Sequence, residues 1–329
     1  MTEQNIKNIL GQAGFFARYK VYLLILAKIA IAAGMLFYLV VNIKPKEIYS
    51  AVQTANLTFV AFAFLLTFLN VFLQYYKWKL TVNLILQENN NSKIWTSMFY
   101  GFSAGIFTPA RVGEYFGRAI AFKNKSLLQV TLATMIDKFF PFLIITFAGS
   151  IAGILFIHFH YHVSFYLTLG IFITVFTLFY FLILLMFNDS FWDNILFTKL
   201  RRSIKFHPLF YKVKILRKLD KKYAIKMFLL SAAFYLCFII QYALLVSAFS
   251  NHNNFAEYLW AGNLIMFAKT IIPISLGDLG VREGASVYFI MQIGESASVA
   301  FNASIFLFFI NVLIPSFIGL LLLLKKNDD

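Results

Sequence analysis

Two segments far apart in the sequence share one arrangement of proline, glycine, acid and arginine. The first runs from Pro109 to Arg118 and the second from Pro273 to Arg282, and both fit the pattern P-x-x-x-G-[E/D]-x-x-x-R. In each segment the acid precedes the arginine by four residues, which places both side chains on one face of a helix in the favoured order. Such a pair can be a structural ion pair, or its guanidinium can bind an anionic group such as a phosphate.

Charged residues within the apolar stretches are few, and each has to be accounted for. At the centre of a lipid-exposed helix a charge costs about 2.5 to 3.5 kcal/mol, so these residues must face inward, pair with one another or line water. Lys138 is one of them, and Arg111, Glu114 and Arg118 are spaced to form one helical stripe. The residues that we predict to bind or translocate a substrate are Arg111, Glu114, Arg118, Asp137, Lys269, Asp278, Arg282 and Glu283. The residues that we predict to interrupt the helices are Pro109, Gly113, Pro273, Gly277 and Gly280.

These charges are compatible with two roles. They can be ion pairs that lock the two interrupted segments together, or they can line a polar cavity for a charged substrate. Neither motif contains His or Cys. We therefore expect no metal site, no cofactor and no catalytic residue among them.

The rest of the chain indicates that these motifs lie in a membrane. Of the 329 residues, 60% are hydrophobic and 13% are charged, and the mean hydropathy is +0.76. A helix needs about 20 apolar residues to span a bilayer. Six runs meet that length, and they predict an all-α polytopic membrane protein: 22–41, 57–76, 127–157, 163–187, 224–249 and 297–324.

Two further apolar stretches, 94–122 and 257–293, contain the motifs and are broken midway. We predict that each is a re-entrant helical hairpin, because irregular backbone is tolerated within a membrane only where protein or water covers it. With their flanking helices they form two copies, at about 57–157 and 224–324, that cross the membrane in opposite senses. The sequence thus predicts a single integral membrane domain, 1–329, built as an inverted repeat, which is an architecture of alternating-access transporters.

The basic residues lie mainly between the apolar runs. The chain has 29 Lys and Arg against 14 Asp and Glu, a formal net charge of +15, and the loop 188–226 alone holds eleven of the basic residues. The positive-inside rule explains this distribution without a nucleic-acid partner. We expect a cell inner (plasma) membrane protein with cytoplasmic N- and C-termini, and we place Lys77, just past the run 57–76, on the cytoplasmic side.

The two motifs resemble the paired signatures of the lysylphosphatidylglycerol synthase transmembrane family, also called the flippase-like domain family. The resemblance covers nearly the whole chain, and it implies a lipid-translocating domain, which in the best-known members moves aminoacylated phosphatidylglycerol between leaflets. Asp137 stands where the family often has an acid after a Glu-Arg pair, but here Ala133 to Ile136 precede it. The residues that match the charges of the family's signatures are Arg111, Glu114, Arg118, Arg282 and Glu283.

Three functions are compatible with these features. The favoured one is a lipid flippase or transporter, in which inward-facing arginines bind a polar or charged head group of the lipid-phosphate kind. The alternatives are an integral membrane transferase acting on a lipid and a non-transporting membrane scaffold. No soluble aminoacyltransferase domain is expected in the chain, so a transporter is favoured over an enzyme. The expected partners are anionic or phosphate-bearing membrane lipids and a separate aminoacyl- or glycosyltransferase.

Overall fold

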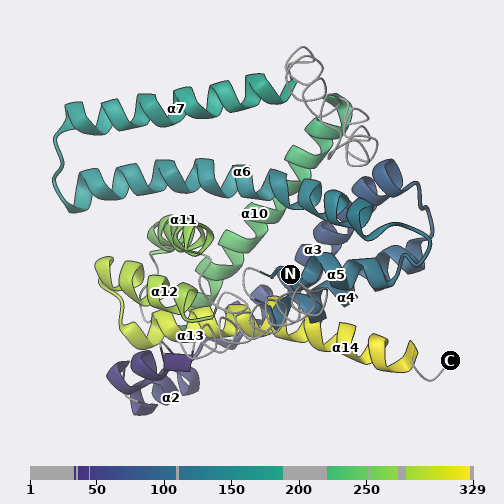
Figure 1. Ribbon diagram of the computed structural model, residues 1–329. Helices are drawn as coiled ribbons and strands as arrows, with labels where there is room; N and C mark the ends of the chain where they lie inside the picture. The colour runs from purple at the N-terminus through teal and green to yellow at the C-terminus, as the bar shows by residue number, and fades with distance from the viewer. Residues whose placement is uncertain are drawn as a thin grey trace, which may run out of the picture.

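The computed structural model describes residues 33–34, 36–43, 45–108, 111–187, 221–250, 252, 254–272 and 279–326. Within these ranges every regular element is a helix (Figure 1). The predicted helix breakers Pro109, Pro273 and Gly277 lie outside the described residues, as do the candidate acid Asp278 and most of the basic loop. The elements are α2 (Pro45–Gln53), α3 (Leu57–Thr81), η1 (Val82–Leu86), α4 (Asn91–Ile106), α5 (Gly113–Ile120), α6 (Leu127–His160), α7 (Phe165–Phe187), α10 (Lys221–Phe249), α11 (Phe255–Ile271), α12 (Val281–Gln292), α13 (Ala297–Phe308), η5 (Phe309–Leu313) and α14 (Ile314–Lys326).

Five segments among the described residues are long and apolar enough to cross a membrane. They correspond to the five predicted runs that begin at 57, 127, 163, 224 and 297, whereas the run 22–41 lies mostly outside the described residues. The chain is therefore a helical protein that crosses the membrane several times. The five segments are Leu57–Leu86, Leu127–His160, Phe165–Leu184, Lys221–Phe249 and Ala297–Lys325.

The helix that begins at Leu57 is longer than the sequence suggested. The side chain of Asn56 accepts a hydrogen bond from the N–H of Thr58 and so caps its start. The α-helical pattern continues past the predicted end at residue 76 to Thr81 and then passes into the π-helix η1. Lys77, which the predicted run 57–76 left outside the helix, is thus part of the helix and buried.

The first interrupted segment consists of two short helices that pack closely. α4 and α5 are separated by residues 107–112 and lie against each other over small residues. A Cβ atom added at Gly113 would lie 2.1 Å from the carbonyl oxygen of Ala104, and one added at Gly117 would lie 2.4 Å from that of Tyr100. Glycine at both positions therefore allows the two backbones to approach.

We expect Gly117→Ala to destabilise the protein, because the new methyl group would push α5 away from α4. Overpacking of this kind costs about 1–3 kcal/mol, so the melting temperature in detergent should fall by several degrees. Gly170→Ala on α7 is the matched control, since a Cβ there meets nothing within 4 Å. Equal melting temperatures for both variants would contradict the close packing of α4 and α5.

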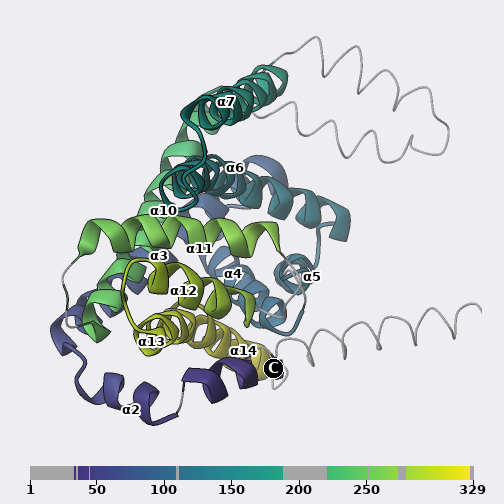
Figure 2. The same cartoon turned by 90° about the vertical axis from the view of Figure 1, so that its left-hand side faces the viewer.

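α10 lies at the centre of the helix packing. It contacts α3, α6, α11 and α13 and contributes more residues than any other helix to the largest buried apolar cluster. α6 and α7 run antiparallel along one side of the molecule (Figure 1). α11 lies crosswise to them, since it is seen nearly end-on in Figure 1 and along its length in Figure 2. α4 packs against α14, and α11 against α6.

Candidate functional site

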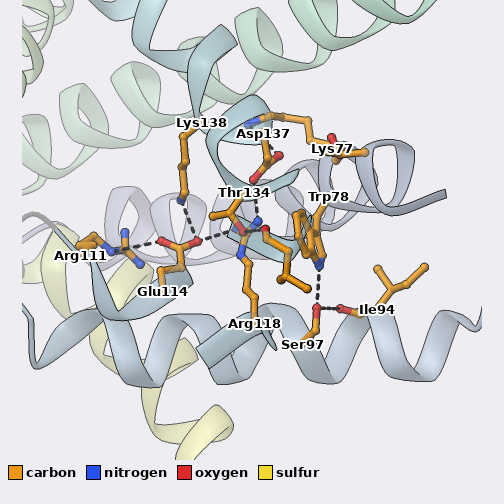
Figure 3. Close-up of polar contacts among 12 residues, drawn as sticks. Lys77, Trp78, Ile94, Ser97, Arg111, Glu114, Arg118, Thr134, Asp137 and Lys138 are labelled. Carbon is orange, nitrogen blue, oxygen red and sulfur yellow. Dashed lines mark hydrogen bonds and ion pairs between the residues drawn. The ribbon is translucent and has the colours of Figure 1, made fainter. Parts of the chain in front are cut away.

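Three elements bring six charged side chains together beside α5. We call this group the cationic cluster. Figure 3 shows that its members point toward Glu114 or toward its neighbour Asp137. Lys77 comes from α3, and Arg111 comes from the turn before α5. Glu114 and Arg118 lie on α5, and Asp137 and Lys138 lie on α6. The members are Lys77, Arg111, Glu114, Arg118, Asp137 and Lys138.

Glu114 is the centre of the cluster and is 1% exposed. Its Oε1 lies 2.5 Å from Nη2 of Arg118 and 2.8 Å from Nζ of Lys138. Its Oε2 lies 3.8 Å from Nε of Arg111 and has no hydrogen-bond partner among the described residues. A single buried carboxylate is thus surrounded by three cations.

Arg118 joins three helices. It donates from Nη1 to Oδ2 of Asp137 at 2.9 Å, which links α5 to α6. Its guanidinium lies over the ring of Trp78 on α3, 4.1 Å from the centroid. The indole N–H of Trp78 in turn donates to Oγ of Ser97 on α4 at 2.7 Å. Arg118 is therefore a buried residue whose side chain is held by contacts with α3, α5 and α6.

Two members of the cluster show what the sequence could and could not indicate. Asp137 does participate, although the residues before it depart from the family's pattern. Lys77, which follows directly after the predicted run 57–76, lies 3.9 Å from Oδ1 of Asp137 and 5.1 Å from the ring centroid of Phe234. The signal that could have identified Lys77 is the apolar and aromatic residues on both sides of it, including Trp78.

The cluster does not balance its own charge. It contains four basic side chains and two carboxylates, so two positive charges are in excess. The side chains of Lys77 and Arg118 are 4% and 2% exposed, whereas those of Arg111 and Lys138 are 24% and 35% exposed. The excess charge is thus accessible at Arg111 and Lys138, on either side of Glu114 (Figure 3).

Arg111 lies outside the helix on which it was expected. α5 begins at Gly113, so the single stripe predicted for Arg111, Glu114 and Arg118 holds only for the last two. Arg111 has φ +55°, a left-handed conformation that is uncommon for a residue with a Cβ. The turn is held by a 2.6 Å hydrogen bond from the N–H of Gly113 to Oγ1 of Thr108. Strained residues of this kind often occur at functional sites.

The second motif is built differently. Arg282 and Glu283 are fully buried and form an ion pair with each other. Nε of Arg282 also donates to Oγ of Ser304 at 2.9 Å, and Oε2 of Glu283 accepts the N–H of Gly280 at 2.6 Å, which caps α12. Gly280 has φ +89°, which requires glycine. These contacts fit a structural role, and the two charges balance.

The structure does not bring all the predicted site residues to one place. Among the described residues, no hydrogen bond or ion pair joins the cationic cluster to the pair of Arg282 and Glu283. Lys269, on α11, has its ammonium 5.6 Å from the ring centroid of Phe238. The motif around residue 111 is therefore the better candidate for binding a charged substrate.

Comparison with protein families agrees with this architecture. The family model described as Lysylphosphatidylglycerol synthase TM region matches residues 25–319. No curated protein matches the chain significantly. Because the family match covers most of the sequence and the paired motifs lie within it, the chain belongs to the lysylphosphatidylglycerol synthase transmembrane region family, and it is a multi-pass membrane protein involved in lipid handling.

Proposed function

We propose that the protein moves a lipid with an anionic, phosphate-bearing head group between the leaflets of the membrane. The observation that carries this proposal is the charge balance of the cationic cluster, which holds two positive charges in excess. Lys77, Asp137 and Lys138 of this cluster lie on segments long enough to span a bilayer, Leu57–Leu86 and Leu127–His160. An unbalanced charge is costly in a membrane. An anionic ligand would offset that cost, so the cluster favours such a head group.

Arg111 and Lys138 are the residues that we propose to bind the phosphate. Both are partly exposed, and both contact Glu114, which holds them in place when no lipid is bound. A phosphate would compete with this carboxylate for the two cations, and the arginine could offer it two parallel N–H donors. The buried residues of the cluster would then hold Glu114 and the proposed site in place. These residues are Arg118, Asp137 and Lys77.

We further propose that the two halves are related as an inverted repeat and rock against each other. In each half a long helix, two shorter helices and a further long segment follow in the same order. The packing is reciprocal, because α4 contacts α14 of the other half while α11 contacts α6. The crosswise direction of α11 is a departure from exact symmetry. This arrangement supports alternating access at the interrupted helices.

The topology of the repeat leads to a labelling prediction. If both interrupted segments are re-entrant, cysteines placed at Ser92 and Asn124 should be labelled from one side of the membrane, and those at Asn254 and Gln292 from the other. All four positions are exposed. The background would be Cys237→Ala, which removes the one native thiol. An impermeant thiol reagent applied to sealed vesicles gives the answer, and labelling of residues 92 and 124 from opposite sides would rule out the first hairpin.

Reconstitution distinguishes transport from the alternatives. We expect purified protein in liposomes to equilibrate a fluorescent phosphatidate between leaflets and to return it chemically unchanged, as read by dithionite quenching and mass spectrometry. Altered lipid would indicate a transferase instead. Intact lipid with no exchange above empty liposomes would contradict the proposed function.

A further inference from the structure

An apolar cavity lies beside the interrupted helix pair of the first motif. Its volume is about 360 Å³, within the range of small-ligand pockets. One wall comes from the end of α4 and the turn after it, and the opposite wall from η5 and α14. Its lining includes Ile106, Phe107, Phe309, Leu313, Ile314 and Phe317.

A local break in the helix shapes the second wall. Pro315 has no N–H to continue the hydrogen-bond ladder, and the chain before it forms the π-helix η5, in which the N–H of Ile314 bonds to the carbonyl of Phe309. Farther along α14, Gly319 allows close contact with α4, since a Cβ there would lie 2.1 Å from the carbonyl oxygen of Phe99. The π-helix η5 before Pro315 and the close contact at Gly319 thus shape the cavity.

The cavity lies near the cationic cluster. Arg111 has its guanidinium 5.8 Å from the ring centroid of Phe102. The backbone carbonyl of Phe102 accepts a hydrogen bond from Oγ of Ser316 at 3.1 Å, and Ser316 lines the cavity. Because its hydroxyl is engaged in that bond, this one polar lining residue adds little polarity. One turn of chain, 107–111, separates the apolar lining from the proposed phosphate site.

We propose that this cavity binds an acyl chain of the lipid whose phosphate is held by Arg111 and Lys138. The inference rests on the proposed function, and it assigns the tail site of the same ligand. A phosphate-bearing lipid has a charged head beside apolar chains, and the protein places a cationic group beside an apolar cavity in the same way. A bulk lipid would fill the cavity regardless of its head group, whereas a bound substrate would fill it only when its head group is anionic.

Photo-crosslinking tests this difference directly. Two lipids with the same diazirine-bearing tail, one a phosphatidate and one a phosphatidylcholine, would be added to the reconstituted protein. We expect the phosphatidate to label peptides containing Phe107 and Leu313 several-fold more than the phosphatidylcholine, and we expect Arg111→Met with Lys138→Met to remove that preference. Equal labelling by both lipids would show annular lipid only and would overturn the inference.

A cavity-filling substitution provides the second test. Leu313→Trp should lower exchange of long-chain phosphatidate about tenfold, because the indole would occupy the space of the tail. The matched control is Leu321→Trp, at an exposed position of α14 that does not line the cavity, and it should exchange lipid as the wild type does. Full exchange in Leu313→Trp would refute the tail site while leaving the proposed function intact. Absence of exchange in the wild type itself would instead refute the proposed function.

Discussion

Replacing Arg111 and Lys138 together by methionine is expected to abolish the exchange of anionic lipid while leaving the protein folded. These two side chains carry the accessible part of the cluster's positive charge, and both contact only Glu114 among the ion-pair partners in the described residues. Their loss removes the proposed ligands of the phosphate. We expect at least a hundredfold slower exchange of phosphatidate in liposomes and a melting temperature within a few degrees of the wild type.

The control for this variant is Lys123→Met. Lys123 is exposed in the turn between α5 and α6 and contributes no ion pair to the cluster. The same change of charge and shape there should leave exchange unaltered. If the double variant is folded and exchanges lipid at the wild-type rate, Arg111 and Lys138 do not form the head-group site.

Arg118→Met is expected to have the largest effect on stability. Arg118 makes the single hydrogen bond that Asp137 accepts from another side chain in the described residues, and the next cation, Lys77, is 3.9 Å away. Removing one partner of a buried ion pair leaves the other uncompensated and costs about 3–5 kcal/mol. We expect a large fall in the melting temperature of the detergent-solubilised protein and little folded material for transport assays.

The second substitution Asp137→Asn, added to Arg118→Met, should recover part of that loss, because it removes the stranded carboxylate. Glu114 keeps Lys138 at 2.8 Å in both variants, so the comparison isolates Asp137. A melting temperature of Arg118→Met equal to that of the wild type would show that the ion pair of Arg118 with Asp137 is not needed for stability. Recovery by Asp137→Asn would distinguish an electrostatic cause from simple loss of side-chain volume.

The sequence predicts the contacts of the site that lie within one helix, and not those between helices. The spacing of Glu114 and Arg118 correctly indicates an ion pair within one helix. The contact of Lys138 with Glu114 joins residues from two helices, and only the packing of α5 against α6 produces it. The predicted run ended before Lys77 because the end of an apolar run does not mark the end of its helix, and a lysine can stay in the helix when a carboxylate such as Asp137 faces it.

The two segments share their spacing, but the contacts of their arginines differ among the described residues. Arg282 pairs with its own neighbour Glu283 and with Ser304, and it makes no ion pair with the cluster there. The acidic and basic residues around a motif arginine decide whether its positive charge is balanced by a carboxylate or adds to an excess of positive charge. For the first motif that information lies in the fold, because Asp137 and Lys138 come from another helix.

We propose that the excess positive charge of the cluster selects an anionic head group. The decisive experiment compares leaflet exchange of two fluorescent lipids with identical tails, phosphatidate and phosphatidylcholine, in liposomes that contain the wild-type protein. Exchange of the phosphatidate at least tenfold faster than that of the phosphatidylcholine, with the difference lost in Arg111→Met/Lys138→Met, is the predicted result. Equal exchange of both lipids by the wild type, or a preference that persists in the double variant, would contradict the account.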